Sequence, residues 1–169
     1  LAGAAEATVV LMAARPGNHE LQSVEELDRF VQGIHSTNWR RVIGCCLLAS
    51  LFAEAGAVER AIEVIRRPGD PERAGFYGPE LVRMEGELRR RLDPRAEVGT
   101  YFERAIAMAR RGELLSLELR ASVSLARLWR DTGRGVEARR LLDSVYARFT
   151  EGFDTADLRA AKTLLGELG

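Results

Sequence analysis

Apolar residues recur along this chain at helical spacing, in segments separated by short stretches that contain glycine or proline. Side chains three and four positions apart share one face of a helix, so each segment predicts an amphipathic helix with one apolar side. The glycine and proline residues then indicate where one helix ends and the next begins. The hydrophobic pattern therefore predicts an all-α protein.

Three of these segments carry the same set of marks, which predicts a repeat. A residue in an apolar helix, small in each unit, is followed by a turn residue seven positions later, a second mark after twelve and a large apolar residue after sixteen. The marks are Ala49, Gly56, Ala61 and Ile65; Gly86, Asp93, Val98 and Phe102; and Ala126, Gly133, Ala138 and Leu142. Two units also place an aromatic residue, Phe52 or Trp129, three positions after the first mark.

Each mark has a physical cause. Small residues let the two helices of a hairpin approach closely, and glycine at the turn enters the left-handed conformation without strain. The large apolar residue fills the gap to the next pair of helices. This pattern is typical of tetratricopeptide repeats, although the units are 37 and 40 residues apart, against about 34 in the standard repeat.

The spacing also predicts where the units depart from the standard repeat. We expect the extra residues in the connectors Arg66–Phe76 and Arg110–Ser116. The second unit is the least regular, because Arg89 stands in place of the aromatic residue and Val98 in place of the second small one. Gly86 and Ala138 are expected at helix–helix contacts, with Trp129 largely buried between neighbouring pairs.

The predicted fold is a tetratricopeptide-type helical-hairpin solenoid that forms a single domain over residues 1–169. A capping box at Ser23–Glu26 and a short apolar segment at 5–14 predict two further helices near the start of the chain. Asp154 and Asp157 predict the N-terminus of a last helix. The predicted parts are degenerate N-terminal helices at 1–37, repeat hairpins at 38–67, 77–110 and 115–149, and a C-terminal capping helix at 154–168.

Several runs of the sequence carry a family resemblance. They are Glu80–Leu88, Tyr101–Arg110, Ser116–Arg130 and Val145–Thr155. These runs resemble the C-terminal tetratricopeptide-repeat region of large bacterial signalling proteins. In that family a class III adenylate/guanylate cyclase or a DNA-binding output domain is joined to a signal-transduction ATPase and then to the repeats. The resemblance covers about residues 40 to 169 and implies a regulatory, protein-binding module, with the catalytic parts outside this chain.

The candidate chemistry within the chain predicts no enzyme. No Gly-x-x-x-x-Gly-Lys-Ser/Thr phosphate loop is present, and the carboxylates alternate with arginines at helical spacing, as on a solvated face. His19 and His35 have no neighbouring ligand pattern, so neither a metal nor a cofactor is expected. The adjacent Cys45 and Cys46 are expected to pack as small hydrophobic residues and to indicate a reducing cytoplasm. No apolar run approaches the roughly 20 residues that span a bilayer, so no membrane contact is expected.

A basic stripe is the candidate binding feature. In this repeat type the concave groove is built from the first helix of each pair, at fixed positions around the first mark. The predicted groove residues are Arg83, Glu87, Arg90, Arg120, Arg127 and Arg130. Arginine offers a planar fork that binds carboxylates or phosphates, whereas the corresponding positions of the first unit are small and neutral. The alternative is that these arginines pair with Glu80, Glu87 and Asp131 on a solvated surface.

Three functional classes compete for this stripe. The leading one is binding of a protein segment or of a neighbouring domain of the parent chain, within a signalling or transcription-regulating ATPase. The second is a small-molecule effector site, against which we note that few aromatic residues project into the predicted groove. The third is nucleic-acid binding, and the formal net charge of zero argues against it. Self-association stays open.

Overall fold

The computed structural model describes residue 29 and residues 39–169, and this part of the chain is all-helical. The described elements are α3 (Trp39–Glu54), α4 (Val58–Ile65), the 3₁₀ turns η1 (Pro71–Arg73) and η2 (Gly75–Tyr77), α5 (Gly78–Leu92), α6 (Gly99–Arg111), α7 (Leu115–Asp131), α8 (Gly135–Tyr146) and α9 (Ala156–Glu167). The helices predicted near residues 5–14 and 23–34 lie outside the described residues, apart from Arg29, which is helical and exposed.

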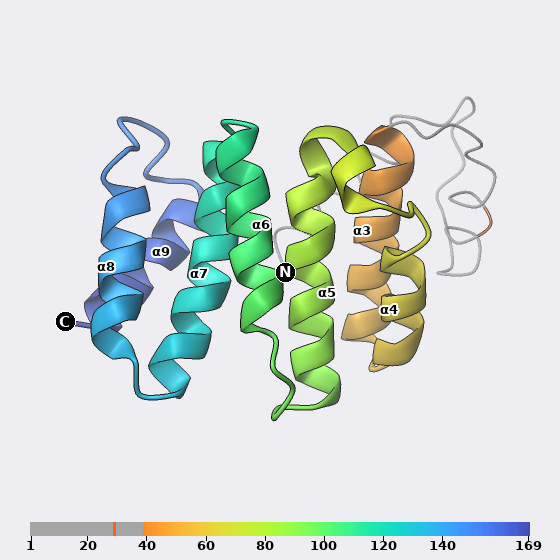
Figure 1. The fold of residues 1–169 in the computed structure, drawn as a ribbon, viewed down its shortest axis with the longest axis horizontal. Helices are drawn as coiled ribbons and strands as arrows, with labels where there is room; N and C mark the ends of the chain where they lie inside the picture. Colours follow the sequence, from red (N-terminus) through yellow and green to blue (C-terminus); the bar gives the residue numbers. More distant parts are fainter. Residues whose placement is uncertain (1–28, 30–38) are drawn as a thin grey trace.

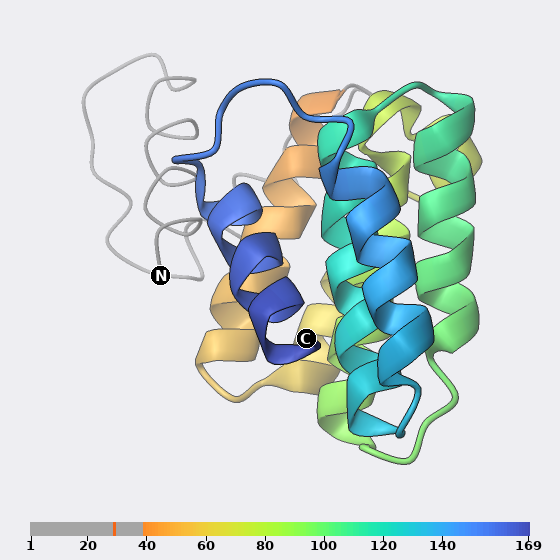
Figure 2. The same cartoon turned by 90° about the vertical axis from the view of Figure 1, so that its left-hand side faces the viewer.

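The helices pair into three antiparallel hairpins, α3–α4, α5–α6 and α7–α8, and α9 follows the last of them. The hairpins stand side by side along the long axis of the molecule (Figure 1). Each second helix packs against the first helix of its own hairpin and against the next first helix along the chain. The first helices α3, α5, α7 and α9 also contact one another in series. The view turned by 90° shows α9 lying beside α7 at the end of the stack, where it also contacts α8 (Figure 2).

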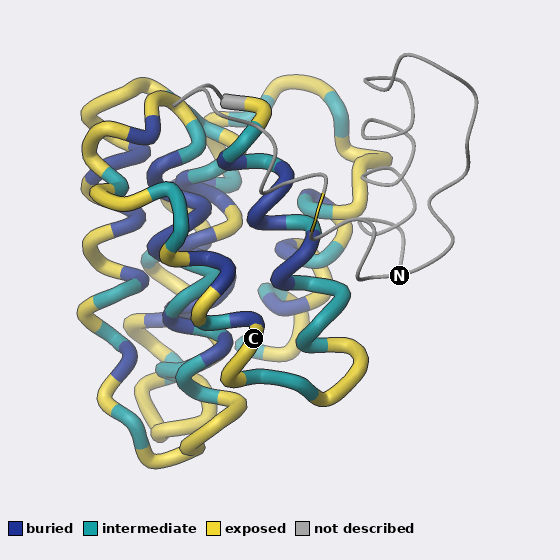
Figure 3. Tube along the Cα trace, turned by 90° about the vertical axis from the view of Figure 1, so that its right-hand side faces the viewer, coloured by how far each residue is buried: buried dark blue, intermediate teal, exposed yellow. Residues whose placement is uncertain are grey.

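The predicted marks are buried where the hairpins pack. Ala49, Ala61 and Ile65 lie in the cluster around α3 and α4, and Ala126, Ala138 and Leu142 lie in the cluster around α7, α8 and α9. Buried and exposed residues alternate along each helix, so that the buried ones face neighbouring helices (Figure 3). Cys45 and Cys46 are buried in the first cluster, in the manner expected of small hydrophobic residues.

Two of the hairpins turn through a left-handed glycine, as the marks predict. Gly56 has a φ of 82° and Gly133 a φ of 81°. A side chain at such an angle would be strained, which accounts for glycine at both turns. Both turns are short, so the second helix of each hairpin begins close to the end of the first.

The second hairpin departs from the predicted register, and two expectations were wrong. Helix α6 begins only at Gly99, so Val98 precedes the helix and the fourth helical residue is Phe102, where α4 has Ala61 and α8 has Ala138. The extra residues of this unit lie in the loop 93–98, whereas the connector between α6 and α7, where we placed them, is only 112–114. The connector 66–77 does hold extra residues, folded into η1 and η2.

Gly86 is the reason that the second hairpin can hold a large residue at this crossing. A Cβ at Gly86 would lie 2.8 Å from Cε1 of Phe102 and 2.9 Å from Cβ of Tyr101. Phe102 itself is fully buried, at 0% exposure. The missing side chain of Gly86 therefore makes the space that the Phe102 ring occupies, and Gly86 lies at a helix–helix contact as predicted.

Each hairpin carries an arginine over an aromatic ring near the turn that joins its two helices. The guanidinium of Arg134 lies 4.3 Å from the centre of the Trp129 ring, and Arg60 lies 5.9 Å from that of Phe52. In the second hairpin the roles are exchanged: Arg89 comes from the first helix and Tyr101 from the second, at 5.3 Å. Trp129 is partly buried and packs against both the cluster around α7, α8 and α9 and the cluster around α5, α6 and α7, while Arg134 lies over its ring.

Candidate partner-binding face

The predicted stripe lies on two helices that pack against each other. Helix α5 carries Arg83, Glu87 and Arg90, and helix α7 carries Arg120, Arg127 and Arg130. We call these six residues the arginine face. Residues seven apart, such as Arg83 and Arg90, lie on one side of a helix. Because α5 and α7 are consecutive first helices in contact, the structure brings the two sets together.

At the N-terminal end of α5 the arginine face is occupied by a buried carboxylate. Glu80 is 6% exposed and accepts two hydrogen bonds from Arg83, at 2.9 and 2.7 Å. Arg120, on the neighbouring helix α7, lies 3.6 Å from the same carboxylate and also pairs with Asp157 of α9 at 2.6 Å. The third nitrogen of the Arg83 guanidinium donates to the hydroxyl of Ser124 on α7, at 3.4 Å.

The charges of this network outweigh the effect of burial. Burial alone would raise the pKa of Glu80, but the charges and hydrogen bonds of Arg83 and Arg120 lower that pKa below its ordinary 4.5. Burial also opposes the charge of Arg83, yet the pKa of Arg83 is raised because Glu80 lies so close. Next to them, burial raises the pKa of the Cys46 thiol well above its ordinary value, and the Glu80 charge adds to the effect. The Cys46 thiol is therefore uncharged, so the network of charged side chains does not continue onto α3.

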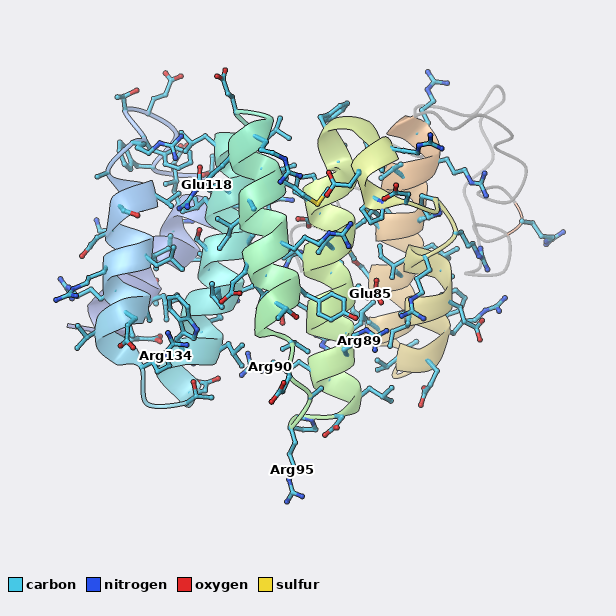
Figure 4. All side chains as sticks on the ribbon, in the orientation of Figure 1. Glu85, Arg89, Arg90, Arg95, Glu118 and Arg134 are labelled. Carbon is cyan, nitrogen blue, oxygen red and sulfur yellow. The ribbon has the colours of Figure 1, made fainter. Side chains whose placement is uncertain are left out.

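At the C-terminal ends of the helices, four side chains of alternating charge form a row. Arg90 reaches from α5 to Asp131 at the end of α7 (Figure 4). Arg130 pairs with the same carboxylate at 2.9 Å and with Glu167 of α9. Burial acts to raise the pKa of Asp131, but hydrogen bonds from Arg130 and Arg90 outweigh it, so this pKa is lowered. Exposed pairs of this kind contribute only about 0.2–1 kcal/mol each, because water screens them.

Arg127 differs from the other arginines of the face. It is exposed and, within the part of the chain that the structure describes, no carboxylate lies at ion-pair distance from it. Glu87 makes only a long contact of 3.9 Å with Arg83. Arg127 is thus the predicted groove residue whose charge no described side chain neutralises.

The sequence reasoning foresaw only some of these carboxylates. Glu80, Glu87 and Asp131 were considered as partners of the arginines, but Asp157 and Glu167 were not. Each of the two lies 37 residues after its arginine, Arg120 and Arg130 respectively, which is the spacing of the first two repeat units. That spacing, applied to the last helix, would have found them.

A second buried carboxylate, Glu118, was missed altogether. It lies in the first turn of α7, is 1% exposed, and accepts hydrogen bonds from Arg110 at 2.7 Å and Arg148 at 2.5 Å. Arg110 lies in the last turn of α6 and Arg148 follows α8, so Glu118 joins three parts of the stack at the end opposite to Arg134 (Figure 4). Its sequence context, between Leu117 and Leu119, gave no sign of burial.

The described residues offer no other obvious chemistry. They contain no group of three or more His, Cys, Asp or Glu side chains placed to hold a metal ion. None of the described helices is long and apolar enough to cross a bilayer. What the arrangement can do is present guanidinium groups to an anionic group, because most pairs of the arginine face stay open to water.

Comparison with known proteins adds no relative. No protein-family model matches the chain. Neither the curated proteins nor the solved structures gave a match.

Proposed function

We propose that this chain is a tetratricopeptide-type repeat module that binds a protein segment and carries out no catalysis itself. In the setting that the family resemblance implies, it is the regulatory part of a bacterial signalling or transcription-regulating ATPase in the cytoplasm. Its partner is an acidic segment of another protein or of a neighbouring domain of the parent chain.

The observation that carries this proposal is the serial contact of the first helices. Because α3, α5, α7 and α9 touch one another in order, their outer sides form one continuous face that belongs to no second helix. Helical-repeat proteins bind extended segments along a surface of this kind. The burial of the repeat marks and the left-handed glycines of two turns support the same repeat type.

The charges on α7 support an acidic partner. Arg127 has no described carboxylate beside it, and Arg120 and Arg130 lie one to two turns away on the same helix. The half-exposed guanidinium groups of Arg120 and Arg130 keep donors free for a further acceptor. Several such contacts must act together, since a single exposed ion pair contributes only about 0.2–1 kcal/mol.

A selection from a random peptide-display library tests the proposal. The full chain is immobilised and the selected peptides are compared with those selected by the Arg127→Glu variant, whose melting temperature serves as the folding control. We expect the parent chain to enrich peptides rich in Asp and Glu, and the variant to lose that enrichment. Absence of any enriched peptide, or the same peptides from both proteins, would contradict the proposal.

A further inference from the structure

Two carboxylates of this chain occupy the positions that a partner's carboxylates would take. Asp131 lies between Arg90 and Arg130, and Glu167 pairs with the far side of Arg130. All four side chains are partly open to water, with exposed fractions of 27% for Arg90, 38% for Arg130 and Asp131, and 47% for Glu167. A carboxylate arriving from solvent can therefore reach both guanidinium groups without any helix moving.

The helix ends make these two acids easy to displace. Asp131 is the last residue of α7 and Glu167 the last of α9, where the helix dipole disfavours negative charge. Arg90 and Arg130 lie in the last turns of α5 and α7, where the same dipole favours positive charge. The arginines are thus well placed by their own helices, whereas the acids depend on the arginines.

We propose that Asp131 and Glu167 are intramolecular competitors that hold Arg90 and Arg130 until an acidic segment of a partner replaces them. This inference rests on the proposed function, in which the first helices receive such a segment. When the segment binds, its carboxylates pair with Arg90 and Arg130, and Asp131 and Glu167 turn to solvent. Arg127, which has no described carboxylate to displace, provides the first contact.

The network around Glu80 does not take part in this exchange. Glu80 is buried and held by Arg83 through two short hydrogen bonds, so it is not replaced by a ligand from solvent. The competition is therefore confined to the C-terminal ends of α5, α7 and α9. This gives the arginine face a fixed end and an exchangeable end.

The test measures binding of a fluorescein-labelled oligoglutamate peptide by anisotropy at constant ionic strength. A double variant, Asp131→Asn with Glu167→Gln, removes the competitors and keeps their shape. The matched control, Glu137→Gln with Asp143→Asn, makes the same change of net charge on α8, where both acids are exposed and paired with arginines. An oligoglutamine peptide controls for contacts that do not depend on charge, and melting temperatures confirm folding.

We expect the double variant to bind oligoglutamate about two- to tenfold more tightly than the parent chain, as the loss of one or two competing exposed pairs allows. The control variant should change affinity much less, and adding Arg127→Glu to the double variant should abolish the gain. If the parent chain binds the probe through Arg127 but the double variant gains no more than the control, the competition is refuted while the proposed function stands. If neither protein binds oligoglutamate, both are refuted.

Discussion

The second and third hairpins solve the same packing problem in opposite ways. In α7–α8 two alanines, Ala126 and Ala138, occupy the corresponding positions, where both are fully buried in one cluster. In α5–α6 a glycine meets a phenylalanine: the absent side chain of Gly86 is compensated by the Phe102 ring. A close helix crossing therefore has to be filled by a certain total side-chain volume. Two alanines can supply that volume, and so can a glycine opposite a phenylalanine.

The arginine–aromatic contacts show the same exchange. The third hairpin takes Trp129 from its first helix and Arg134 from the start of its second, whereas the second hairpin takes Arg89 from the first and Tyr101 from the second. The sequence irregularity at Arg89 is thus not a lost contact. It is the same contact with its two members exchanged.

The largest expected effect is at Phe102. We predict that Phe102→Ala lowers the free energy of unfolding by about 3–5 kcal/mol, because it empties a crossing where Gly86 has no side chain to collapse into the space. Chemical denaturation monitored by circular dichroism measures it. An effect under about 1 kcal/mol would show that the ring does not fill this crossing.

Gly86 tests the compensation directly. We predict that Gly86→Ala in the parent chain is destabilising by about 1–3 kcal/mol, because its Cβ would lie within 3 Å of Phe102 and Tyr101. In the Phe102→Ala background the same change should be less harmful, because only the clash with Cβ of Tyr101 remains and alanine favours the helix by about 1 kcal/mol over glycine. A double-mutant cycle measures this coupling. Additive effects would contradict the pairing of the two residues.

Much of this fold was predictable, and the exception has a clear cause. The marks at Ala49, Ala126 and Gly133 depend on periodicity and turn chemistry, both of which are visible in sequence. In the second unit Val98, twelve positions after Gly86, fits the pattern almost as well as Phe102, which takes the place of Ala61 and Ala138 in the structure. The pattern therefore could not reveal that the loop 93–98 shifts the start of α6. Asp93 signals that α5 ends but does not signal how long the loop is. In the structure its backbone is extended and its carboxylate accepts a hydrogen bond from the Arg95 amide at 2.9 Å.

The candidate face was predictable by position but not by pairing. The helical spacing placed the arginines on adjacent faces of α5 and α7, as the structure shows. Which of them are neutralised depends on how α9 lies against α7, and the repeat marks do not extend to α9. The burial of Glu118 was similarly hidden, because a glutamate in the first turn of an amphipathic helix is ordinarily solvated.

The second and third hairpins differ in charge at one corresponding position. Helix α5 has Glu80 there, whereas α7 has Arg120 forty positions later. The folded protein holds the pKa of Glu80 below its ordinary 4.5, so this carboxylate stabilises the fold at pH values above 4.5. That contribution is lost as the pH falls from 4.5 through the lower pKa of the folded state. We predict that Glu80→Gln lowers the free energy of unfolding at neutral pH by about 1–3 kcal/mol, because Arg83 loses its charged partner.

The sign of the pH effect provides the check. Denaturation curves at neutral pH and at several values below 4.5 should show that the Glu80→Gln variant loses less stability on acidification than the parent chain. Equal acid sensitivity would mean that Glu80 is not held as a carboxylate by Arg83 and Arg120. The matched change Glu87→Gln, at a carboxylate with one long contact of 3.9 Å, should lower the free energy of unfolding at neutral pH much less than Glu80→Gln does.

The turns of the two hairpins should respond differently to alanine. Gly133 has a φ of 81°, and nothing lies within 4 Å of a Cβ built there, so Gly133→Ala meets backbone strain alone. We expect a loss of about 1–2 kcal/mol. Asp93→Ala loses one exposed bond to the Arg95 amide, for about 0.5–1 kcal/mol. Thermal unfolding of the two variants ranks them, and a larger loss at Asp93 would show that its turn is the more constrained.

The smallest expected effect is at the exchanged arginine–aromatic contacts. Arg134 lies over the Trp129 ring at 4.3 Å, closer than Arg89 lies over Tyr101 at 5.3 Å, so we predict that Arg134→Ala lowers stability by about 0.5–1 kcal/mol and Arg89→Ala by about half as much. Arg89 also pairs with Glu85 at 3.0 Å, and Glu85 keeps its contact with Arg66 at 2.6 Å when Arg89 is removed. Trp129 fluorescence, measured in a Trp39→Phe background so that no other tryptophan emits, isolates the aromatic contribution. Removal of Arg134 exposes one side of the indole and should shift its emission to longer wavelength. An unchanged emission in Arg134→Ala would show that the guanidinium does not cover the ring, and the parallel between the two hairpins would then hold for their crossings alone.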